Sequence, residues 1–113
     1  MKPGDVILVP IPQIAGGASK LRPALLLATL PGPYQNLLLC GISTQLQQLQ
    51  TDWDEVVRPA DPDYQTSGLH RTSAIRLSYL YAADHREIAG VIGRVDHARL
   101  ERLLTRLTDH LRP

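Results

Sequence analysis

Residues 19–28 read SKLRPALLLA, in which two cations and a proline precede an unbroken apolar run. The apolar residues 24–29 are typical of a strand that is covered on both faces. Pro23 fixes its own φ angle and pushes Arg22 into an extended conformation. An arginine held in this way presents a planar fork that suits a phosphate. The stretch therefore predicts a buried strand with either an anion-binding arginine or a solubilising charge at its mouth.

Other segments also have the composition of strands. They are residues 4–11 (GDVILVPI), 36–44 (NLLLCGIST), 72–82 (TSAIRLSYLYA) and, more weakly, 52–57 (DWDEVV). Alternation along residues 72–82 puts Arg76 and Ser78 on the more polar side and Tyr79 on the other. Residues 58–68 hold prolines, a glycine and several turn formers. We therefore expect a surface loop there, whose acidic side chains bond to nearby backbone.

The carboxy-terminal segment has the pattern of an amphipathic helix. Asp96 is a good N-cap, and leucines recur at helical spacing at positions 100, 103, 104, 107 and 111. Arg99, Arg102 and Arg106 lie off this stripe, where a solvated face is expected. Four or five short strands followed by one helix predict a mainly β protein with a C-terminal α-helix. We expect a small, strongly bent sheet or barrel, forming one domain over residues 1–113.

Composition argues against several classes of function. The net charge of +1 is too small to bind nucleic acid through a bulk field, so any polyanion must be held by a local patch. The single cysteine, Cys40, allows no intrachain disulfide, which favours a cytoplasmic protein with a buried, inert thiol. The histidines lack metal-ligand spacing and there is no phosphate-binding glycine loop, so we expect no metal and no cofactor. No apolar stretch approaches the ~20 residues of a membrane span.

What remains is a set of polar side chains near the ends of predicted strands. In chain order they are Lys20, Arg22, Ser43, Thr44, Gln45, His70, Arg71, Arg76 and Ser78. The hydroxyls of Ser43 and Thr44 can donate to the same anion as Arg22, or orient a nucleophile. Each signal is weak by itself, and their order along the chain is more informative than any one of them.

Taken in order, these segments resemble the PemK/MazF family of toxin endoribonucleases. The first half matches through GDVILVPIP, the Lys20-Leu-Arg22-Pro23 stretch with its apolar strand, and Gly41-Ile-Ser43-Thr44-Gln45. The second half matches through GLHRTSAIRLSYLYAAD (68–84) and IAGVIGRVDHARLERLLTRL (88–107), which resemble the family's arginine-bearing strand and closing helix. The resemblance covers most of the chain and is loose only between about residues 46 and 68.

The resemblance implies an SH3-like β-barrel with a terminal helix that works as a homodimer. It implies metal-independent cleavage of single-stranded RNA and a cognate antitoxin that blocks the groove, with DNA contacted only through that antitoxin. Residue by residue, the family's motif arginine falls on Arg22, its catalytic hydroxyl on Ser43 with Thr44 beside it, and its later arginine on Arg76. The aspartate of the PemK branch falls on Ser78, and a serine cannot act as a general base.

Metal-free RNA cleavage needs charge stabilisation and a proton acceptor. Arg22 and Arg76 would stabilise the charge that develops when a 2′-hydroxyl attacks the neighbouring phosphate, an effect worth ~3–4 kcal/mol per donor. The products would be a 2′,3′-cyclic phosphate and a free 5′-hydroxyl. His70 is the only histidine near the motif strands and is the candidate base. The RNA-binding candidates are Lys20, Gln45, His70, Arg71 and Ser78, with Trp53 and Tyr64 as loop aromatics able to stack a base.

Two other functions remain open at this point. The same barrel fold serves toxins that poison DNA gyrase through an aromatic-containing carboxy-terminal motif, whereas residues 110–113 read HLRP. A catalytically inactive barrel that only binds a partner would fit Ser78 and the modest net charge. Growth arrest on expression, and the dependence of that arrest on Arg22, distinguishes these functions from RNA cleavage.

Overall fold

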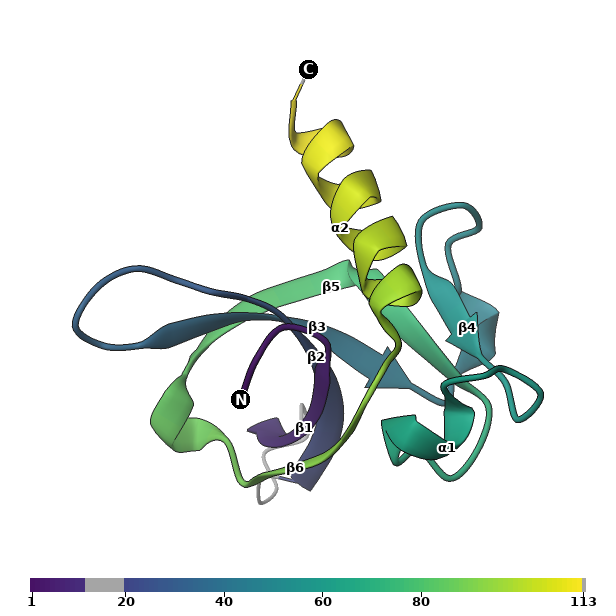
Figure 1. Cartoon of the computed structure of the whole chain (residues 1–113), viewed down its shortest axis with the longest axis horizontal. Coiled ribbons are helices and arrows are strands. Elements are labelled where there is room, and N and C mark those ends of the chain that lie inside the picture. Colours follow the sequence, from purple (N-terminus) through teal and green to yellow (C-terminus); the bar gives the residue numbers. More distant parts are fainter. Residues whose placement is uncertain (12–19, 113) are drawn as a thin grey trace.

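Within residues 1–11 and 20–112, which the computed structural model describes, six strands form one antiparallel sheet (Figure 1). In chain order they are β1 (Asp5–Ile11), β2 (Lys20–Thr29), β3 (Asn36–Ser43), β4 (Glu55–Val57), β5 (Ser73–Asp84) and β6 (Gly90–Arg94). Their order across the sheet is β4-β5-β3-β2-β1-β6. The described helices are α1 (Tyr64–Ser67), α2 (His97–Leu111) and the 3-10 turns η1 (Leu46–Gln48) and η2 (His85–Glu87).

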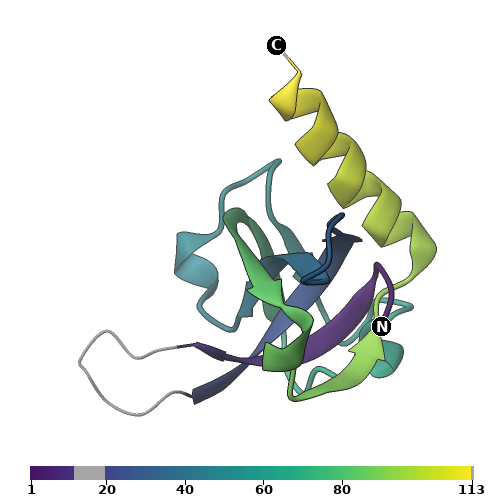
Figure 2. The same ribbon diagram turned by 90° about the vertical axis from the view of Figure 1, so that its left-hand side faces the viewer.

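The sheet is strongly curled and forms half of a barrel, with α2 standing against it (Figures 1 and 2). Register shifts interrupt three of its ladders, between Val6 and Ile7, between Leu26 and Ala28, and between Cys40 and Gly41. Each irregularity of this kind bends the strand and increases its local twist. The predicted class, mainly β with a bent sheet and a terminal helix, is confirmed.

The sequence analysis expected four or five strands, whereas the described residues form six. The strand that was not predicted is β6. Two of its five residues, Gly90 and Gly93, are glycines, which weaken the sequence signal of a strand. These residues form a strand because they pair with β1, where Asp5 opposes Arg94 and Leu8 opposes Gly90.

Both faces of the central strands are buried, as the unbroken apolar run predicts. On β2, Leu25 and Leu27 pack into one core, whereas Ala24 and Leu26 face a second core on the other side. The leucines of α2 at positions 100, 103 and 107 close the first core. The second core lies between β1, β2, β3 and the last part of β5, where Ala83 is buried.

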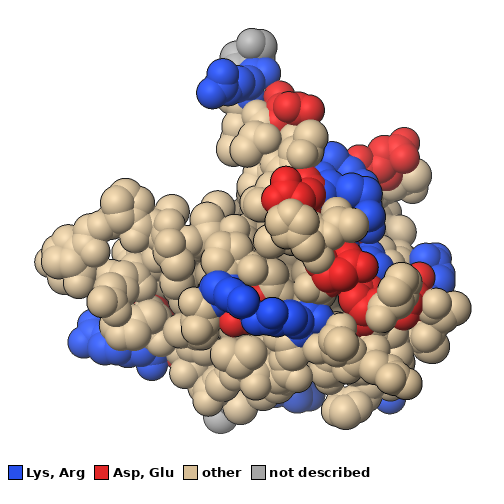
Figure 3. Space-filling view, in the orientation of Figure 1, with Lys and Arg blue, Asp and Glu red and all other residues tan. Residues whose placement is uncertain are grey.

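Helix α2 is fixed to the sheet by an ion-pair network as well as by its leucines. The guanidinium of Arg99 is buried and donates to Asp63 (Nε–Oδ2, 2.8 Å) and Glu55 (Nη1–Oε1, 2.9 Å). Arg102 and Arg106 donate to the same Glu55 carboxylate. A solvated face was therefore the wrong prediction for Arg99, because Asp63, which is buried, and Glu55 of β4 accept its hydrogen bonds. Side chains of both signs lie next to one another over this part of the surface (Figure 3).

Residues 58–68 are not the plain surface loop that their composition predicts. Asp63 and Ser67 are buried, and residues 64–67 form the single turn of α1. Gly68 ends this turn with φ at 75°, and a Cβ there would collide with the carbonyl group of Ile92 on β6. Only glycine allows α1 to pack so closely against β6. The prediction holds for Asp61, whose carboxylate accepts a hydrogen bond from the backbone amide of Arg58.

Cys40 is buried in β3, as predicted. Burial, together with the negative charge of Asp54, raises the pKa of its thiol to about 12. A thiol with this pKa is almost entirely protonated near neutral pH and is a poor nucleophile. Across the described part of the chain, none of the helices is both long enough and apolar enough to cross a bilayer.

Candidate active site

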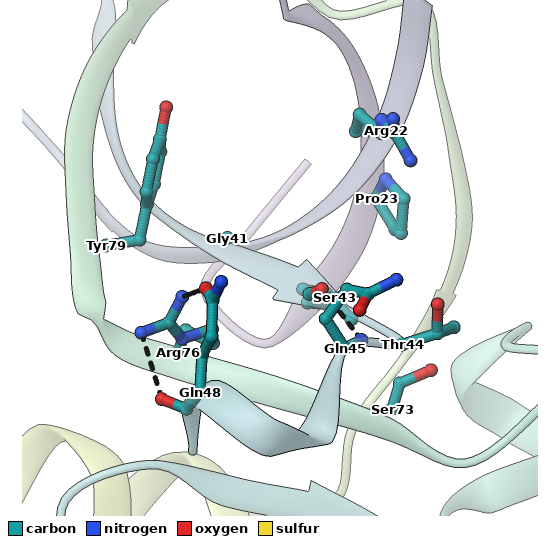
Figure 4. A pocket seen from close by; sticks show the side chains of 11 residues that line it. Arg22, Pro23, Gly41, Ser43, Thr44, Gln45, Gln48, Ser73, Arg76 and Tyr79 are labelled. Atoms are coloured by element: carbon teal, nitrogen blue, oxygen red, sulfur yellow. Dashed lines mark hydrogen bonds between the residues drawn. The ribbon is translucent and has the colours of Figure 1, made fainter. Parts of the chain in front are cut away.

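A pocket of about 560 Å³ lies across β2, β3 and β5, where β3 ends (Figure 4). Its lining residues are Arg22, Pro23, Gly41, Ile42, Ser43, Thr44, Gln45, Gln48, Ser73, Arg76 and Tyr79. Strand pairing brings these segments together, because Ala24 of β2 opposes Gly41 of β3, and Gly41 also opposes Arg76 of β5. The four residues predicted to be catalytic therefore share one pocket although they are distant in the sequence.

Arg22 lies on β2, which begins at Lys20, before the apolar run at which the sequence analysis placed its start. It pairs with Val9, and Pro23 pairs with Leu8, so the arginine is in extended strand as predicted. Its side chain is exposed and forms no hydrogen bond or ion pair within the described residues. Arg22 thus contributes an exposed guanidinium to the pocket wall.

The hydroxyls of the pocket come from the end of β3 and the start of β5. Ser43 Oγ accepts a hydrogen bond from the backbone amide of Gln45 at 3.0 Å, which fixes the turn and leaves the hydroxyl proton for a ligand. Thr44 follows with an exposed side chain. Ser73 adds a third hydroxyl, which donates to the carbonyl oxygen of Arg71 at 2.8 Å. Ser43 and Thr44 therefore both line the pocket, and their role as donors to a ligand stays a prediction.

Arg76 is hydrogen-bonded to Gln48 on the side of the pocket away from Arg22 (Figure 4). Its Nη1 donates to the side-chain Oε1 of Gln48 at 3.1 Å, and its Nη2 donates to the backbone carbonyl of Gln48 at 3.2 Å. Gln48 belongs to η1, and the sequence analysis assigned this residue no role. Gln48 contacts Arg76, which lies 28 residues later in the sequence, so no local sequence pattern predicts this contact.

Tyr79 lines the pocket because β5 does not alternate regularly. Gly41 pairs with Arg76 whereas its neighbour Cys40 pairs with Leu80, so β5 carries extra residues between the two pairs. This bulge turns Tyr79 into the pocket, 47% exposed, although alternation predicts it on the opposite face from Arg76. The ring lies over Gly41, where a Cβ would come within 3.3 Å of it. The sequence analysis sought aromatic residues only in the loop and missed this one.

Comparison with known protein families covers almost the whole chain. A family model described as PemK-like, MazF-like toxin of type II toxin-antitoxin system matches residues 2–111. The chain belongs to this family. No individually curated protein matches it in sequence. Membership identifies the partner class as an antitoxin protein, and it confirms the resemblance inferred from the order of the sequence motifs.

Four of the RNA-binding candidates of this PemK-like toxin do not line the pocket. Lys20 is exposed at the start of β2, and His70 and Arg71 are exposed in the turn before β5. The hydroxyl of Ser78 donates a hydrogen bond to the buried carboxylate of Asp54 at 3.1 Å. Gln45 is the candidate that does lie in the wall. For all five residues, contact with RNA stays a prediction.

The wall of the pocket in this PemK-like toxin carries positive charge and no negative charge. Arg22 and Arg76 are its cationic groups, and none of the described lining residues is Asp, Glu, His or Cys. Two arginine forks with neighbouring hydroxyls suit an anion that has several oxygens. The carboxylate, imidazole and thiol groups that hold metal ions are missing from this donor set. The described wall is therefore suited to an oxyanion rather than to a metal ion.

Proposed function

We propose that this PemK-like toxin is an endoribonuclease that cleaves single-stranded RNA without a metal ion. The observation that carries the proposal is that Arg22, Arg76 and the hydroxyls of Ser43 and Thr44 all line one pocket. The family to which the chain belongs supports the same conclusion. Cleavage of messenger RNA would inhibit translation and stop growth, which is the action expected of the toxin.

In the proposed reaction the 2′-oxygen attacks the neighbouring phosphorus as water takes up its proton, since none of the described lining residues is an acid or a histidine. The bond from phosphorus to the 5′-oxygen breaks, and the departing oxygen takes a proton from water, which gives a 2′,3′-cyclic phosphate and a 5′-hydroxyl. Arg22 and Arg76, from two sides of the pocket, would stabilise the negative charge that grows on the phosphate oxygens. Ser43 and Thr44 would donate to those oxygens or orient the 2′-hydroxyl.

Tyr79 supports a single-stranded substrate. Its ring is half exposed in the pocket and is supported from the side by Tyr81, whose ring lies 5.3 Å away in an edge-on arrangement. Bases splayed out of a single strand stack readily on such rings, whereas bases within a duplex are already stacked on one another. We propose that Tyr79 binds the base next to the scissile phosphate.

Replacing Tyr79 by alanine should weaken RNA binding, whereas replacement by phenylalanine should not. Stacking of one base is worth about 1–3 kcal/mol, so Tyr79→Ala should raise KM roughly tenfold to a hundredfold. The phenyl ring of Tyr79→Phe keeps the stacking surface, and its KM should stay within about threefold of the native value. Steady-state cleavage of a short fluorescent RNA measures both constants. Equal KM values for the two variants would contradict the stacking role.

The remaining parts of the proposal concern assembly and location. We propose a homodimer of single-domain chains, a cytoplasmic site of action, and an antitoxin that covers the pocket and alone contacts DNA. Several large apolar side chains are exposed, among them Val91, Ile92 and Leu21, and they give the dimer or the antitoxin apolar surface to bury. Light scattering should give twice the chain mass at micromolar concentration, and a stable monomer would contradict the dimer.

Expression in bacteria tests the function directly. The native chain should arrest growth with loss of full-length messenger RNA, and co-expression of its antitoxin should restore growth. The supercoiling of plasmid DNA should be unchanged, because the proposed target is RNA. Growth arrest with intact RNA and altered supercoiling would instead indicate a gyrase poison.

A further inference from the structure

Asp54, which directly precedes β4, carries a buried carboxylate behind the pocket wall. Its side chain has no exposed surface and does not line the pocket. The carboxylate accepts hydrogen bonds from the backbone amide of Gln50 at 2.9 Å, and from the backbone amide and hydroxyl of Ser78, each at 3.1 Å. These bonds satisfy a buried polar group and tie the turn before β4 to the bulge of β5.

The guanidinium of Arg76 faces this carboxylate. Its Nε lies 3.7 Å from Oδ2 of Asp54 and has no hydrogen-bond partner within the described chain, while both of its Nη atoms donate to Gln48. A guanidinium has five N–H donors in one plane. With Nε turned toward Asp54 and one donor of each Nη given to Gln48, two N–H groups remain for a ligand.

The resemblance to the PemK branch places an acidic side chain at position 78, on the same strand as Arg76, but this chain has a serine there. The negative charge beside Arg76 belongs to Asp54, 24 residues before Ser78, and the hydroxyl of Ser78 is hydrogen-bonded to it. We infer that Asp54 supplies the counter-charge of Arg76 and positions its guanidinium. This inference rests on the proposed RNA cleavage for its effect on activity.

The burial of Asp54 decides how it acts. Its enclosed carboxylate cannot touch RNA in the pocket, so Asp54 is a positioning residue and not a general base. By fixing the rotation of the Arg76 guanidinium, it keeps two N–H donors in place before RNA binds. Preorganised donors of this kind favour the transition state more than the bound substrate. Loss of the charge should therefore lower kcat more than it raises KM.

Steady-state cleavage of a fluorescent single-stranded RNA tests this role. Asp54→Asn keeps the size of the side chain and removes its charge, and we expect kcat to fall about 10- to 100-fold with KM within about threefold. The matched control is Asp52→Asn, the same change on an exposed carboxylate of the same turn, which should leave both constants unchanged. Native kcat in a folded Asp54→Asn protein would overturn the inference.

A second test moves the carboxylate from position 54 to position 78 and measures whether cleavage activity is recovered. Asp54→Ser should lose activity, and adding Ser78→Asp returns one carboxylate to the same pair of positions. We expect the double variant to recover at least about tenfold in kcat over Asp54→Ser, because the two sites are in contact and their effects are coupled. A purely structural Asp54 would give no recovery, and that result would also overturn the inference.

A readout that needs no activity separates this inference from the proposed function. In the amide and guanidinium NMR spectrum, the Nε–Hε signal of Arg76, assigned by its loss in Arg76→Lys, should shift in Asp54→Asn and stay in place in Asp52→Asn. If the native protein cuts no RNA, the proposed function fails while this shift still supports the Arg76–Asp54 pair. An unmoved signal in Asp54→Asn contradicts the pair whatever the activity.

Discussion

Arg22→Ala should lower kcat for RNA cleavage by about 10²–10³-fold while leaving the protein folded. The side chain is exposed and unbonded within the described residues, so its loss should cost little stability. It is one of two cationic groups in the pocket wall, and without it half of the charge that faces the phosphate is gone. Single-turnover cleavage of a labelled RNA, with circular dichroism to verify folding, measures the effect.

Two variants control this experiment. Arg58→Ala removes an exposed arginine that does not line the pocket, and its rate should equal the native rate. Arg22→Lys keeps the charge but loses the planar fork, so its rate should fall between the native rate and that of Arg22→Ala. If Arg22→Ala cut RNA as fast as the native chain, the pocket would not be the site of cleavage.

Arg99→Met should lower the free energy of unfolding by about 3–5 kcal/mol. The change leaves the Asp63 carboxylate, whose side chain is 1% exposed, without its bidentate partner. For a chain of this size the loss corresponds to a fall in Tm on the order of 10–20 °C. Urea denaturation followed by circular dichroism gives the free energy, and calorimetry gives Tm.

The same substitution at Arg102 is the matched control for this effect. Arg102 is 51% exposed and bonds to Glu55, so Arg102→Met should cost less than about 1 kcal/mol. Adding Asp63→Asn to Arg99→Met removes the uncompensated charge, and the double variant should be more stable than Arg99→Met alone. If Arg99→Met and Arg102→Met lowered the free energy of unfolding equally, the buried ion pair of Arg99 would contribute no more to stability than the exposed pair of Arg102.

The pH dependence of stability should change in the same variant. Burial opposes ionisation of Asp63, but hydrogen bonds from Arg99 and the Asp96 amide lower the pKa of that carboxyl below its ordinary value. The folded state then binds a proton less readily than the unfolded chain, so the contribution to stability is present above about pH 4 and is lost as the pH falls further. Native and Arg99→Met stabilities should therefore converge in acid.

The apolar run after Arg22 predicted its strand because the pattern reports burial directly. Leu25 and Leu26 face opposite cores, and an unbroken apolar run is typical of a strand covered on both sides. The leucine stripe predicted α2 for the same reason, and Asp96 caps the helix by accepting from the amide of Arg99. Where the local pattern of apolar residues reflects what each residue packs against, the sequence alone is sufficient to predict the strand or helix.

Long-range pairing decides the features that the sequence analysis missed. Tyr79 enters the pocket because the ladder between β3 and β5 slips after Arg76, and alternation within one strand cannot report a slip against another. The roles of Asp54 and Gln48 depend on a turn from a different part of the chain meeting β5. Arg99 lies off the leucine stripe, yet it is buried and forms ion pairs with acidic residues that are distant in the sequence. The candidate site was thus predictable in its motif residues and unpredictable in the residues that support them.

Cleavage by the purified chain in EDTA, with analysis of the product ends, tests the central claim most directly. The antitoxin-free protein is incubated with a varied pool of single-stranded RNA, and the ends are assigned by mass spectrometry. We predict cuts that carry a 2′,3′-cyclic phosphate on one fragment and a 5′-hydroxyl on the other, and their loss in Arg22→Ala. Intact RNA after incubation with the folded native protein, or cleavage that appears only when divalent metal is restored, would contradict the account.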